Sequence, residues 1–418
     1  MKSLLLVVLV LTVINVSSPP QLSMSEGHVL NSFCNLLKYG GNPVLSCGAP
    51  GQWDDTAIEQ PCVFRFNSTH WFMFYEGYNA SHPYYYKIGY AYSTDLITWA
   101  KFSGNPVFKP REGGNFFDNS GVGGPSLIHN GTGWLMYYHG RRLSEGHEHY
   151  EIGVAYSTSP TLSSWVRLNG GDPVLSLGAP ESWQGKVVAA PSVIRLKNGT
   201  YIMAFEGATT SWANFRVGLA KCNDPNGVEW TKLSENPVIN LGPSYWDSKY
   251  VAGPHLMLDA ATGKYEIFYA GSSPASHVDG ASGVEFGLAD STDLVRWNKC
   301  DWNPVLRPSS AAWDSIAMNA PCVVKKGTVR YLFYCGRDNT GDGGFEVGLA
   351  FLGIPPMTSL IELLLDKSTG QVYYVYADSK YYIANPSAFD AYGFSWSRVI
   401  PVEHRVLSSY SGGYDLDG

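Results

Sequence analysis

The sequence is poor in charged residues, and beyond its N-terminus it lacks long apolar runs. Only 16% of its 418 residues are Asp, Glu, Lys or Arg, the net charge is −7, and no basic run stands out. A nucleic-acid partner is therefore not expected. After the N-terminus no apolar stretch is long enough to span a bilayer, so we expect no membrane span in the mature chain.

The N-terminus has the features of a secretory signal. Met1, Lys2 and Ser3 precede an apolar stretch at residues 4–13, and small residues follow near Ser18. We expect a signal peptide over residues 1–18 and a secreted mature chain, extracellular or periplasmic. A retained membrane anchor is the alternative.

A tripeptide of Asn or Asp followed by Pro and Val recurs five times. The copies begin at Asn42, Asn105, Asp172, Asn236 and Asn303, so they lie 63 to 67 residues apart. A period of this length marks one supersecondary unit that is repeated along the chain. In the first copy, aromatic and β-branched residues predict strands at 62–66, 71–75, 87–92 and 98–102. Four antiparallel strands make one blade of a β-propeller.

The sequence therefore predicts an all-β fold, a five-bladed β-propeller of four-stranded antiparallel blades over residues 35–353. The fifth copy ends without a fourth strand, whereas residues 36–42 align with the fourth strand of the first copy. We expect this N-terminal strand to close the ring and to remove an exposed sheet edge. Residues 357–418 lack the repeat and are predicted to form a short aromatic C-terminal segment or accessory module.

The seven cysteines show no CxxC spacing, so we expect no zinc site. We also expect no other metal and no cofactor. Cys62 and Cys322 occupy the same Pro-Cys-Val position in the first and fifth copies, which a closed ring brings side by side. They are predicted to form either a disulfide or a pair of buried thiols.

A second repeated feature is an aromatic residue, usually followed by Asp. The pairs are Trp53-Asp54, Phe117-Asp118, Trp183-Gln184, Trp246-Asp247 and Trp313-Asp314. Because Asp is favoured in turns, where it bonds backbone donors, we interpret these residues as scaffold. A polar residue in one copy where the others have Gly or Ala is a better candidate for a functional site.

Such departures gather at one predicted mouth of the channel. Only the first copy has a carboxylate, Glu59, just before the repeated Pro. At the end of the second strand the copies carry Glu76, His139, Glu206, Ala270 and Cys335. Because the first and second strands are antiparallel, the two positions lie at the same rim.

Basic and aromatic residues are expected at the same rim. The candidates for substrate binding are His139, Arg141, His255, Arg337, Trp183, Trp212 and Trp246, together with tyrosines 84–86. Aromatic faces beside polar groups suit the stacking of sugar rings and the bonding of their hydroxyls. We therefore expect a carbohydrate substrate or ligand.

With these features the chain resembles the five-bladed propeller glycosidases of the arabinanase, invertase and levansucrase superfamily, which includes glycoside hydrolase families 43, 32 and 130. The resemblance rests on the fivefold repeat, on AYSTDLITW at 91–99 and ADSTDLVRW at 289–297, and on GPHL at 253–256. It implies hydrolysis or phosphorolysis of glycosides by a general acid and a second carboxylate. Two carboxylates that the resemblance implies are replaced by Gln60 and Ala252.

For an enzyme, the predicted catalytic pair is Glu59 with either Glu206 or Glu76, and Asp55 is a reserve carboxylate. Two other readings stay open. The missing family carboxylates favour a non-catalytic carbohydrate-binding propeller. The Ser-x-Asp turns that end in Trp resemble sialidase repeats, although a sialidase needs three arginines and the obvious rim candidates are Arg141, Arg142 and Arg337.

Overall fold

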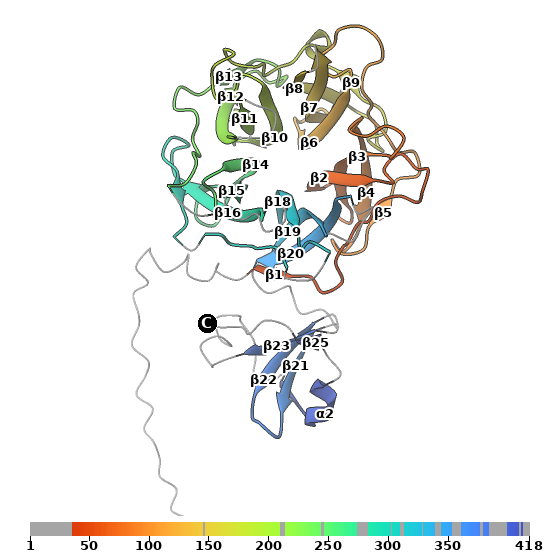
Figure 1. Ribbon diagram of the computed structural model, residues 1–418, viewed down its shortest axis with the longest axis vertical. Coiled ribbons are helices and arrows are strands. Elements are labelled where there is room, and N and C mark those ends of the chain that lie inside the picture. The colour runs from red at the N-terminus through yellow and green to blue at the C-terminus, as the bar shows by residue number, and fades with distance from the viewer. Residues whose placement is uncertain are drawn as a thin grey trace, which may run out of the picture.

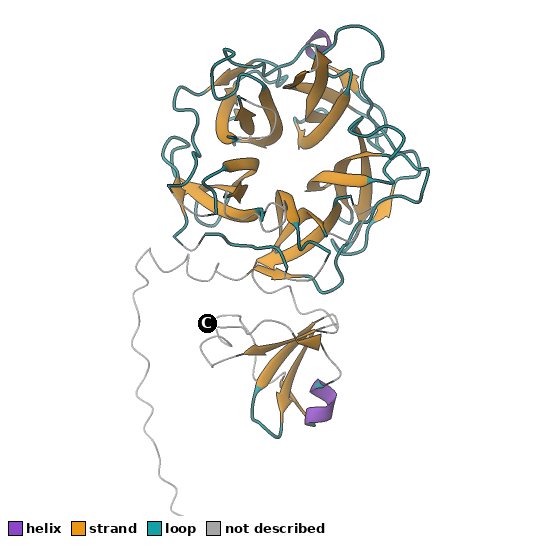
Figure 2. Cartoon of the chain, in the orientation of Figure 1, coloured by secondary structure: helices purple, strands orange, loops and turns teal. Residues whose placement is uncertain are grey.

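The computed structural model of the chain consists almost entirely of β-strands (Figures 1 and 2). It describes residues 36–144, 147–209, 214–243, 246–273, 283–301, 303–309, 313–327, 329–338, 344–352, 361–376, 379–383, 399–408 and 411–412. Several four-stranded antiparallel sheets surround a centre, and the first strand of each sheet lies nearest to that centre (Figure 1). This arrangement is propeller-like.

Two sheets follow the chain in simple order. The first contains β2 (Ala57–Arg65), β3 (Trp71–Tyr78), β4 (Lys87–Ser93) and β5 (Ala100–Lys101). The other contains β14 (Tyr250–Leu258), β15 (Tyr265–Ser272), β16 (Glu285–Ser291) and β17 (Asn298–Lys299). In both, each strand pairs antiparallel with the next along the chain.

Between these two lies a larger sheet made of two four-stranded halves. One half contains β6 (Gly121–His129), β7 (Trp134–Ser144), β8 (His147–Ser157) and β9 (Val166–Arg167), followed by the 3-10 helix η2 (Asn169–Gly171). The other half contains β10 (Val187–Arg195), β11 (Tyr201–Ala208), β12 (Arg216–Cys222) and β13 (Trp230–Lys232). The halves join at one parallel contact, where Val187 pairs with Tyr150.

The last sheet of the series takes its fourth strand from the N-terminus. It contains β18 (Ala317–Lys326), β19 (Val329–Arg337) and β20 (Glu346–Leu352), and β20 pairs antiparallel with β1 (Leu36–Lys38). Lys38 on β1 donates to Asp314 at 2.6 Å, as Lys101 on β5 donates to Asp54 at 2.7 Å. Strand β1 thus has the position in the sheet that the sequence predicts for it.

The Asn of the repeated tripeptide acts as an extra strand partner. Asn105 accepts a hydrogen bond from the N–H of Tyr90 at 3.0 Å and donates to the C=O of the same residue at 2.8 Å. Asn42, Asn236 and Asn303 make the same two bonds to Leu349, Leu219 and Leu288. These bonds give the tripeptide one local role in four of its five copies.

The repeated Asp residues are scaffold, but their partners differ from the loop backbone donors that the sequence suggested. Asp54, Asp118, Asp247 and Asp314 are buried. Each accepts a hydrogen bond from a tyrosine hydroxyl of the second strand, and each forms an ion pair with a Lys or Arg of the fourth strand. The charge of each buried carboxylate is therefore compensated inside its own sheet.

Of the two alternatives for Cys62 and Cys322, the structure has the pair of thiols. Every cysteine within the described residues is free, and Cys34 lies outside that range. The thiol of Cys322 accepts a hydrogen bond from the N–H of Val63 at 3.2 Å, so strand β18 lies beside strand β2. A buried thiol can serve in this way as a weak acceptor.

The C-terminal strands form a separate sheet, in the order β24-β21-β22-β23-β25. Its elements are β21 (Ile361–Asp366), β22 (Val372–Tyr376), β23 (Ser379–Ile383), β24 (Val399–Val402), α2 (His404–Leu407) and β25 (Ser411–Gly412). Leu364, Val375 and Leu407 form a small core within it. The predicted signal at residues 1–18 lies outside the described residues, among which no helix is long and apolar enough to cross a membrane.

Candidate functional site

The innermost strand of each propeller sheet is interrupted just before the repeated Pro. The pairing register shifts at this step in all five inner strands, β2, β6, β10, β14 and β18. The residue before the Pro has a φ between 47° and 55°, and these residues are Gln60, Gly124, Ala190, Gly253 and Ala320. A bulge of this kind removes the residue from the regular ladder, so its N–H needs another acceptor.

Side chains supply those acceptors, in most cases from the preceding sheet. Glu76 accepts from Gly124 at 2.6 Å, His139 accepts from Ala190 at 3.4 Å, and Glu206 accepts from Gly253 at 2.7 Å. In the last sheet Asn319 accepts from Ala320 of its own strand at 2.8 Å. The polar residues that depart from the repeat thus share a structural task, because they satisfy the bulges around the channel.

Two of the carboxyls form a directly opposed pair. Glu59 and Glu76 are cross-strand partners on β2 and β3, where Cβ atoms lie about 5 Å apart. Burial raises the pKa of Glu59 to about 7, against the opposing charge of Arg337. Burial, followed by the charge of Glu59, raises the pKa of Glu76 well above its usual range. At neutral pH the pair therefore retains at least one proton.

Glu206 belongs to the same site. Burial raises the pKa of Glu206 to about 7, although the hydrogen bond from Gly253 opposes this shift. The charge of Glu206 contributes to the raised pKa of Glu76, so the two carboxyls interact. Three acidic groups that bind protons near neutral pH therefore meet at one mouth of the channel.

His139 lies between these carboxyls. Burial lowers the pKa of His139 to about 3, so its imidazole is neutral at pH 7. Its Nδ1 accepts from Ala190, which places the ring proton on Nε2, and this atom lies 3.5 Å from a carboxyl oxygen of Glu76. His139 is 7% exposed, so its position suits the support of Glu76 better than direct contact with a substrate.

Tyrosine hydroxyls surround the carboxyls. Burial, and then the charges of Glu59 and Glu76, raise the pKa of Tyr86 far above its usual range. Burial, followed by the charge of Glu59, raises the pKa of Tyr78 to about 12. Burial, followed by the charge of Glu148 and, to a smaller extent, that of Glu76, also raises the pKa of Tyr150. Sequence reasoning named Tyr86 but missed Tyr78, although Tyr78 follows Glu76 by two residues in one strand and so shares its face.

One hairpin reaches beyond the others at this mouth. Strands β7 and β8 have 11 residues each, whereas β3, β11 and β15 have 8. The extension carries Arg141, which forms an ion pair with Glu148 and donates to the C=O of Tyr84 at 3.3 Å. The Nε of Arg141 and the Oε2 of Glu148 are buried without a partner among the described residues. Arg141 was predicted here, whereas Glu148 and Tyr150 opposite it were not.

Arg337 completes the charged rim. It ends strand β19, its guanidinium lies 5.1 Å from the ring centroid of Phe345, and its side chain is exposed. Its charge favours the ionised form of Glu59. The role of Arg337 in substrate binding stays a prediction.

Below the carboxyls, the five bulges and their Pro residues line a cavity of about 240 Å³. His255 lies in this lining, where its Nε2 donates to the C=O of Val323 at 3.0 Å. Burial lowers the pKa of His255 to about 4. His255 is therefore part of the channel wall and links β14 to β18, rather than part of the rim as the sequence suggested.

Comparison with known proteins places this geometry in a wider group. No family model matches the sequence. A protein of Mycobacterium tuberculosis described as uncharacterized, Rv1502, is 27% identical over 257 residues, which is 59% of this chain and 76% of that protein. A solved glycoside hydrolase superposes with a TM-score of 0.61 at 21% identity, over 79% of this chain and 95% of its own. The chain has the propeller fold of the glycosidases.

Two further structures show how widely this fold is shared. One comes from a study of the GH130 family of mannoside phosphorylases, which contains glycoside hydrolases that target β-1,2-mannosidic linkages in Candida mannan. It has a TM-score of 0.58 at 17% identity, over 76% of this chain and 94% of its own. The other is a thermostable family-43 glycoside hydrolase with a TM-score of 0.52 at 16% identity, over 72% and 92%. At these identities the likeness concerns the fold alone.

This propeller departs from the resemblance at both positions noted in the sequence. Gln60 is the bulge residue of β2 and lines the channel, with no ionisable group. Ala252 pairs with Ala270 on β15, so that sheet has no carboxyl at this level of the mouth. The carboxyls of the site lie instead on Glu59 and at the ends of β3 and β11.

Two tryptophans of the predicted aromatic wall pack instead against residues of their own sheets. Trp183 stacks on Phe205 with centroids 5.7 Å apart, and Trp246 stacks on Tyr269 at 5.4 Å. Both rings also cover glycines of their own sheets, as Trp53 and Trp313 do. Their position inside the sheets does not suit sugar stacking. Trp212 lies outside the described residues.

Asp55, the reserve carboxylate, organises a loop. It accepts hydrogen bonds from the N–H of Gly51 at 2.6 Å, the hydroxyl of Thr56 at 2.9 Å and the N–H of Ala80 at 3.2 Å. These bonds, with that from Gly51 first, lower the pKa of Asp55. Within the described ranges no group of three or more His, Cys, Asp or Glu residues could hold a metal ion.

Proposed function

We propose that this protein is a secreted carbohydrate-active enzyme, a glycoside hydrolase or glycan phosphorylase that acts where Glu59, Glu76 and Glu206 meet. The observation that carries the proposal is this cluster of three carboxyls with raised pKa values at the channel mouth. Glycosidases need one protonated and one ionised carboxyl at the scissile bond. Acids with pKa values near 7 supply both forms at neutral pH.

We assign the ionised role to Glu59. Its carboxylate has no hydrogen bond from the described part of the chain, so both oxygens can reach a ligand, and Arg337 favours its charged form. In hydrolysis Glu59 accepts the proton of the attacking water as the new C–O bond forms. Tyr78 and Tyr86 beside it offer hydroxyls to the sugar.

Glu206 is proposed as the general acid. One of its oxygens accepts from Gly253, which fixes the carboxyl, and the other remains available. Glu206 donates its proton to the glycosidic oxygen as the bond to the anomeric carbon breaks. Glu76 stays protonated and, with the neutral His139, keeps this side of the mouth uncharged.

We also propose that the sheets form a closed ring of five blades, with β1 as the fourth strand of the last. Contacts between the inner strands support this ring, since β2 touches β6, β6 touches β10, β10 touches β14, β14 touches β18, and β18 touches β2. The bond between Val63 and Cys322 belongs to the last of these contacts.

Secretion and the roles of the chain ends are part of the same proposal. The charged start and the apolar residues 4–13 support a signal peptide over residues 1–18, and an extracellular or periplasmic location fits a glycan substrate. Residues 35–353 are proposed as the propeller and 357–418 as an accessory module. Strands β21 to β25 form a sheet of their own, which is consistent with that division, although Leu363, Val372 and Tyr374 belong to one apolar cluster with propeller residues.

The test is turnover of a panel of aryl glycosides and glycan oligosaccharides, with and without inorganic phosphate, by the wild type and by Glu59→Gln, Glu206→Gln and Glu235→Gln. Glu235 is an exposed loop residue and serves as the control. We expect the first two changes to lower kcat by about a hundredfold or more, and the control to match the wild type. Full activity of both site variants would exclude the assigned roles. Glycan binding without turnover by the wild type would identify a binding propeller.

A further inference from the structure

A large groove lies between the last sheet and the first, at the end away from the carboxyls. It has a volume of about 750 Å³, and the polar residues of its lining are Arg65, Ser68, Thr69, Thr94, Lys325 and Lys326. Its walls are the turn that joins β2 to β3, the turn that joins β18 to β19 and the turn that follows β4. Arg65 follows Glu59 by six residues along β2, so the groove lies about 20 Å from the carboxyl site.

Aromatic side chains fill the matching space between the first and second sheets. There Trp134 packs against Phe64 at 4.6 Å and against Phe66 at 6.0 Å between ring centroids. Between the last and first sheets the turn at the end of β18 instead carries Lys325, Lys326 and Gly327. The groove therefore exists because charged and small residues replace packing aromatics at this boundary.

The groove is positively charged in a chain whose net charge is −7. Arg65, Lys325 and Lys326 line it, and no Asp or Glu does. Arg65 donates to the carbonyls of Asn67 at 3.1 Å and Ser68 at 2.9 Å, and Lys326 donates to a carbonyl at 3.5 Å. Carbonyl partners fix these side chains but do not neutralise their charges, and neither Arg65 nor Lys326 has a carboxylate partner within the described residues.

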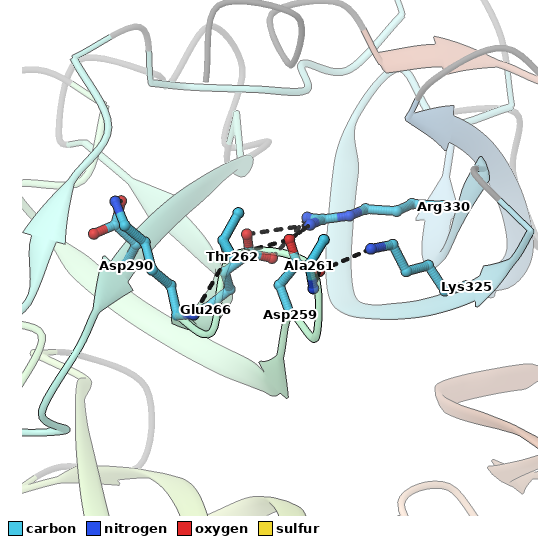
Figure 3. A network of polar contacts seen from close by, with 8 residues as sticks. Asp259, Ala261, Thr262, Glu266, Asp290, Lys325 and Arg330 are labelled. Carbon is cyan, nitrogen blue, oxygen red and sulfur yellow. Dashed lines mark hydrogen bonds and ion pairs between the residues drawn. The ribbon is translucent and has the colours of Figure 1, made fainter. Parts of the chain in front are cut away.

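The third cation belongs to a compensated network that holds this wall in place. Lys325 lies 2.8 Å from Asp259, which also pairs with Arg330 at 3.1 Å, and Arg330 pairs with Glu266 at 2.6 Å (Figure 3). Arg330 and Glu266 are buried, so the network joins the β14–β15 and β18–β19 hairpins. Lys326 therefore projects from a turn whose position is fixed.

We propose that this groove binds an anionic carbohydrate, a glycan segment that carries carboxylate or sulfate groups. Guanidinium and ammonium groups bind such oxyanions by charge-assisted hydrogen bonds. The hydroxyls of Ser68, Thr69 and Thr94 beside them can bond sugar hydroxyls, and the volume lies within the range of ligand pockets. This site is separate from the carboxyl mouth and does not depend on catalysis there.

Calorimetric titration of the whole protein tests the proposal with three probes, namely trigalacturonate, a heparin-derived sulfated tetrasaccharide and neutral maltotetraose. The protein is produced without N-glycosylation, because Asn67-Ser68-Thr69 matches the acceptor pattern for this modification and borders the groove. The site variants are Arg65→Gln/Lys326→Gln and the single reversal Lys326→Glu. The matched control is Lys197→Gln/Lys221→Gln, which removes two exposed charges elsewhere. Thermal unfolding of each variant verifies that it folds.

We expect at least one anionic probe to bind the wild type, with an affinity that falls as the salt concentration rises. The affinity of either site variant for that probe should be lower by about tenfold or more, and the affinity of the control should equal that of the wild type. The probe that binds distinguishes carboxylate from sulfate recognition. Glu59→Gln should bind as the wild type does, so the groove and the catalytic proposal can fail separately. Binding of no anionic probe, equal binding of the neutral probe, or anionic binding that survives both groove variants would overturn the inference.

Discussion

Glu59 and Glu76 face each other across strands β2 and β3, one step before the bulge at Gln60. Two carboxyls at directly opposed positions repel when both are ionised, so the pair holds a proton that isolated glutamates would lose. Raised pKa values with a specific charge partner are characteristic of functional sites. The folded state retains this strained arrangement because backbone bonds elsewhere in both strands fix it.

The raised pKa of Glu206 predicts that stability falls as pH rises. Glu206 has a pKa of about 7 in the folded chain, against 4.5 for an unperturbed Glu. Between these pH values the unfolded chain releases the proton and the folded chain keeps it, so the free energy of unfolding declines through this window and levels off above it. Relative to low pH, this one carboxyl lowers the free energy of unfolding at pH 8 by about 3 kcal/mol.

Glu206→Gln tests this linkage, since its amide oxygen can still accept from Gly253. Thermal unfolding measured from pH 4.5 to pH 8 should show a flatter profile for the variant, with its gain over the wild type largest above pH 7. Glu235→Gln on the exposed loop should reproduce the wild-type slope. Parallel profiles for all three proteins would mean that Glu206 ionises normally.

The repeat allowed the fold to be predicted because its residues make local bonds. Asn105 bonds both backbone groups of Tyr90 within one sheet, so the same contact recurs wherever the tripeptide does. The mouth was predicted for the same reason, because the repeat aligned the copies and exposed Glu59, Glu76 and Glu206 as departures. Alignment of the repeated copies thus identifies the positions at which one copy differs from the others.

The orientation of loop aromatics could not be predicted in this way. Trp183 lies inside its sheet because Gly207 and Gly218 leave room for its ring. The two glycines were the only indication of this packing in the sequence, because a Cβ at Gly207 would lie 2.6 Å from that ring. The acceptors of the bulge N–H groups were also hidden, because those bonds mostly run between residues of different sheets.

Lys38 is predicted to hold the N-terminal strand in place. It pairs with the buried Asp314, so Lys38→Met leaves a buried carboxylate without its cation. We expect a loss of about 3 kcal/mol in the free energy of unfolding and faster hydrogen exchange in β20, the strand that β1 covers. Lys221→Met, an exposed residue in an internal strand, is the control. Unchanged exchange in β20 would show that β1 is held by its backbone bonds alone.

The bulges predict unequal effects for two small substitutions. Gly124 has a φ of 54°, and a Cβ there would lie 2.5 Å from Nδ1 of His139, so Gly124→Ala should destabilise the protein by about 2 kcal/mol or more. Ala190 already adopts a φ of 47° with a Cβ. Ala190→Gly relieves that strain and adds chain entropy to the unfolded state, so its net effect should stay within about 1 kcal/mol of zero.

Denaturant unfolding of both bulge variants beside the wild type measures these two effects. Equal destabilisation by Gly124→Ala and Ala190→Gly would indicate that the bulge conformation does not determine the outcome.

The thiols of Cys62 and Cys322 are predicted to stay reduced and unreactive in the folded protein. Burial raises the pKa of Cys62 to about 12, and it also raises that of Cys322, so neither thiol forms the reactive thiolate near neutral pH. Mass spectrometry after alkylation should find both unmodified in the native protein and both labelled after unfolding. A Cys62–Cys322 disulfide in protein from an oxidising compartment would contradict this expectation.

Cys322→Ala should lower the free energy of unfolding by about 1 to 3 kcal/mol, because the N–H of Val63 loses its acceptor. Cys322→Ser keeps an acceptor and should lower it by less.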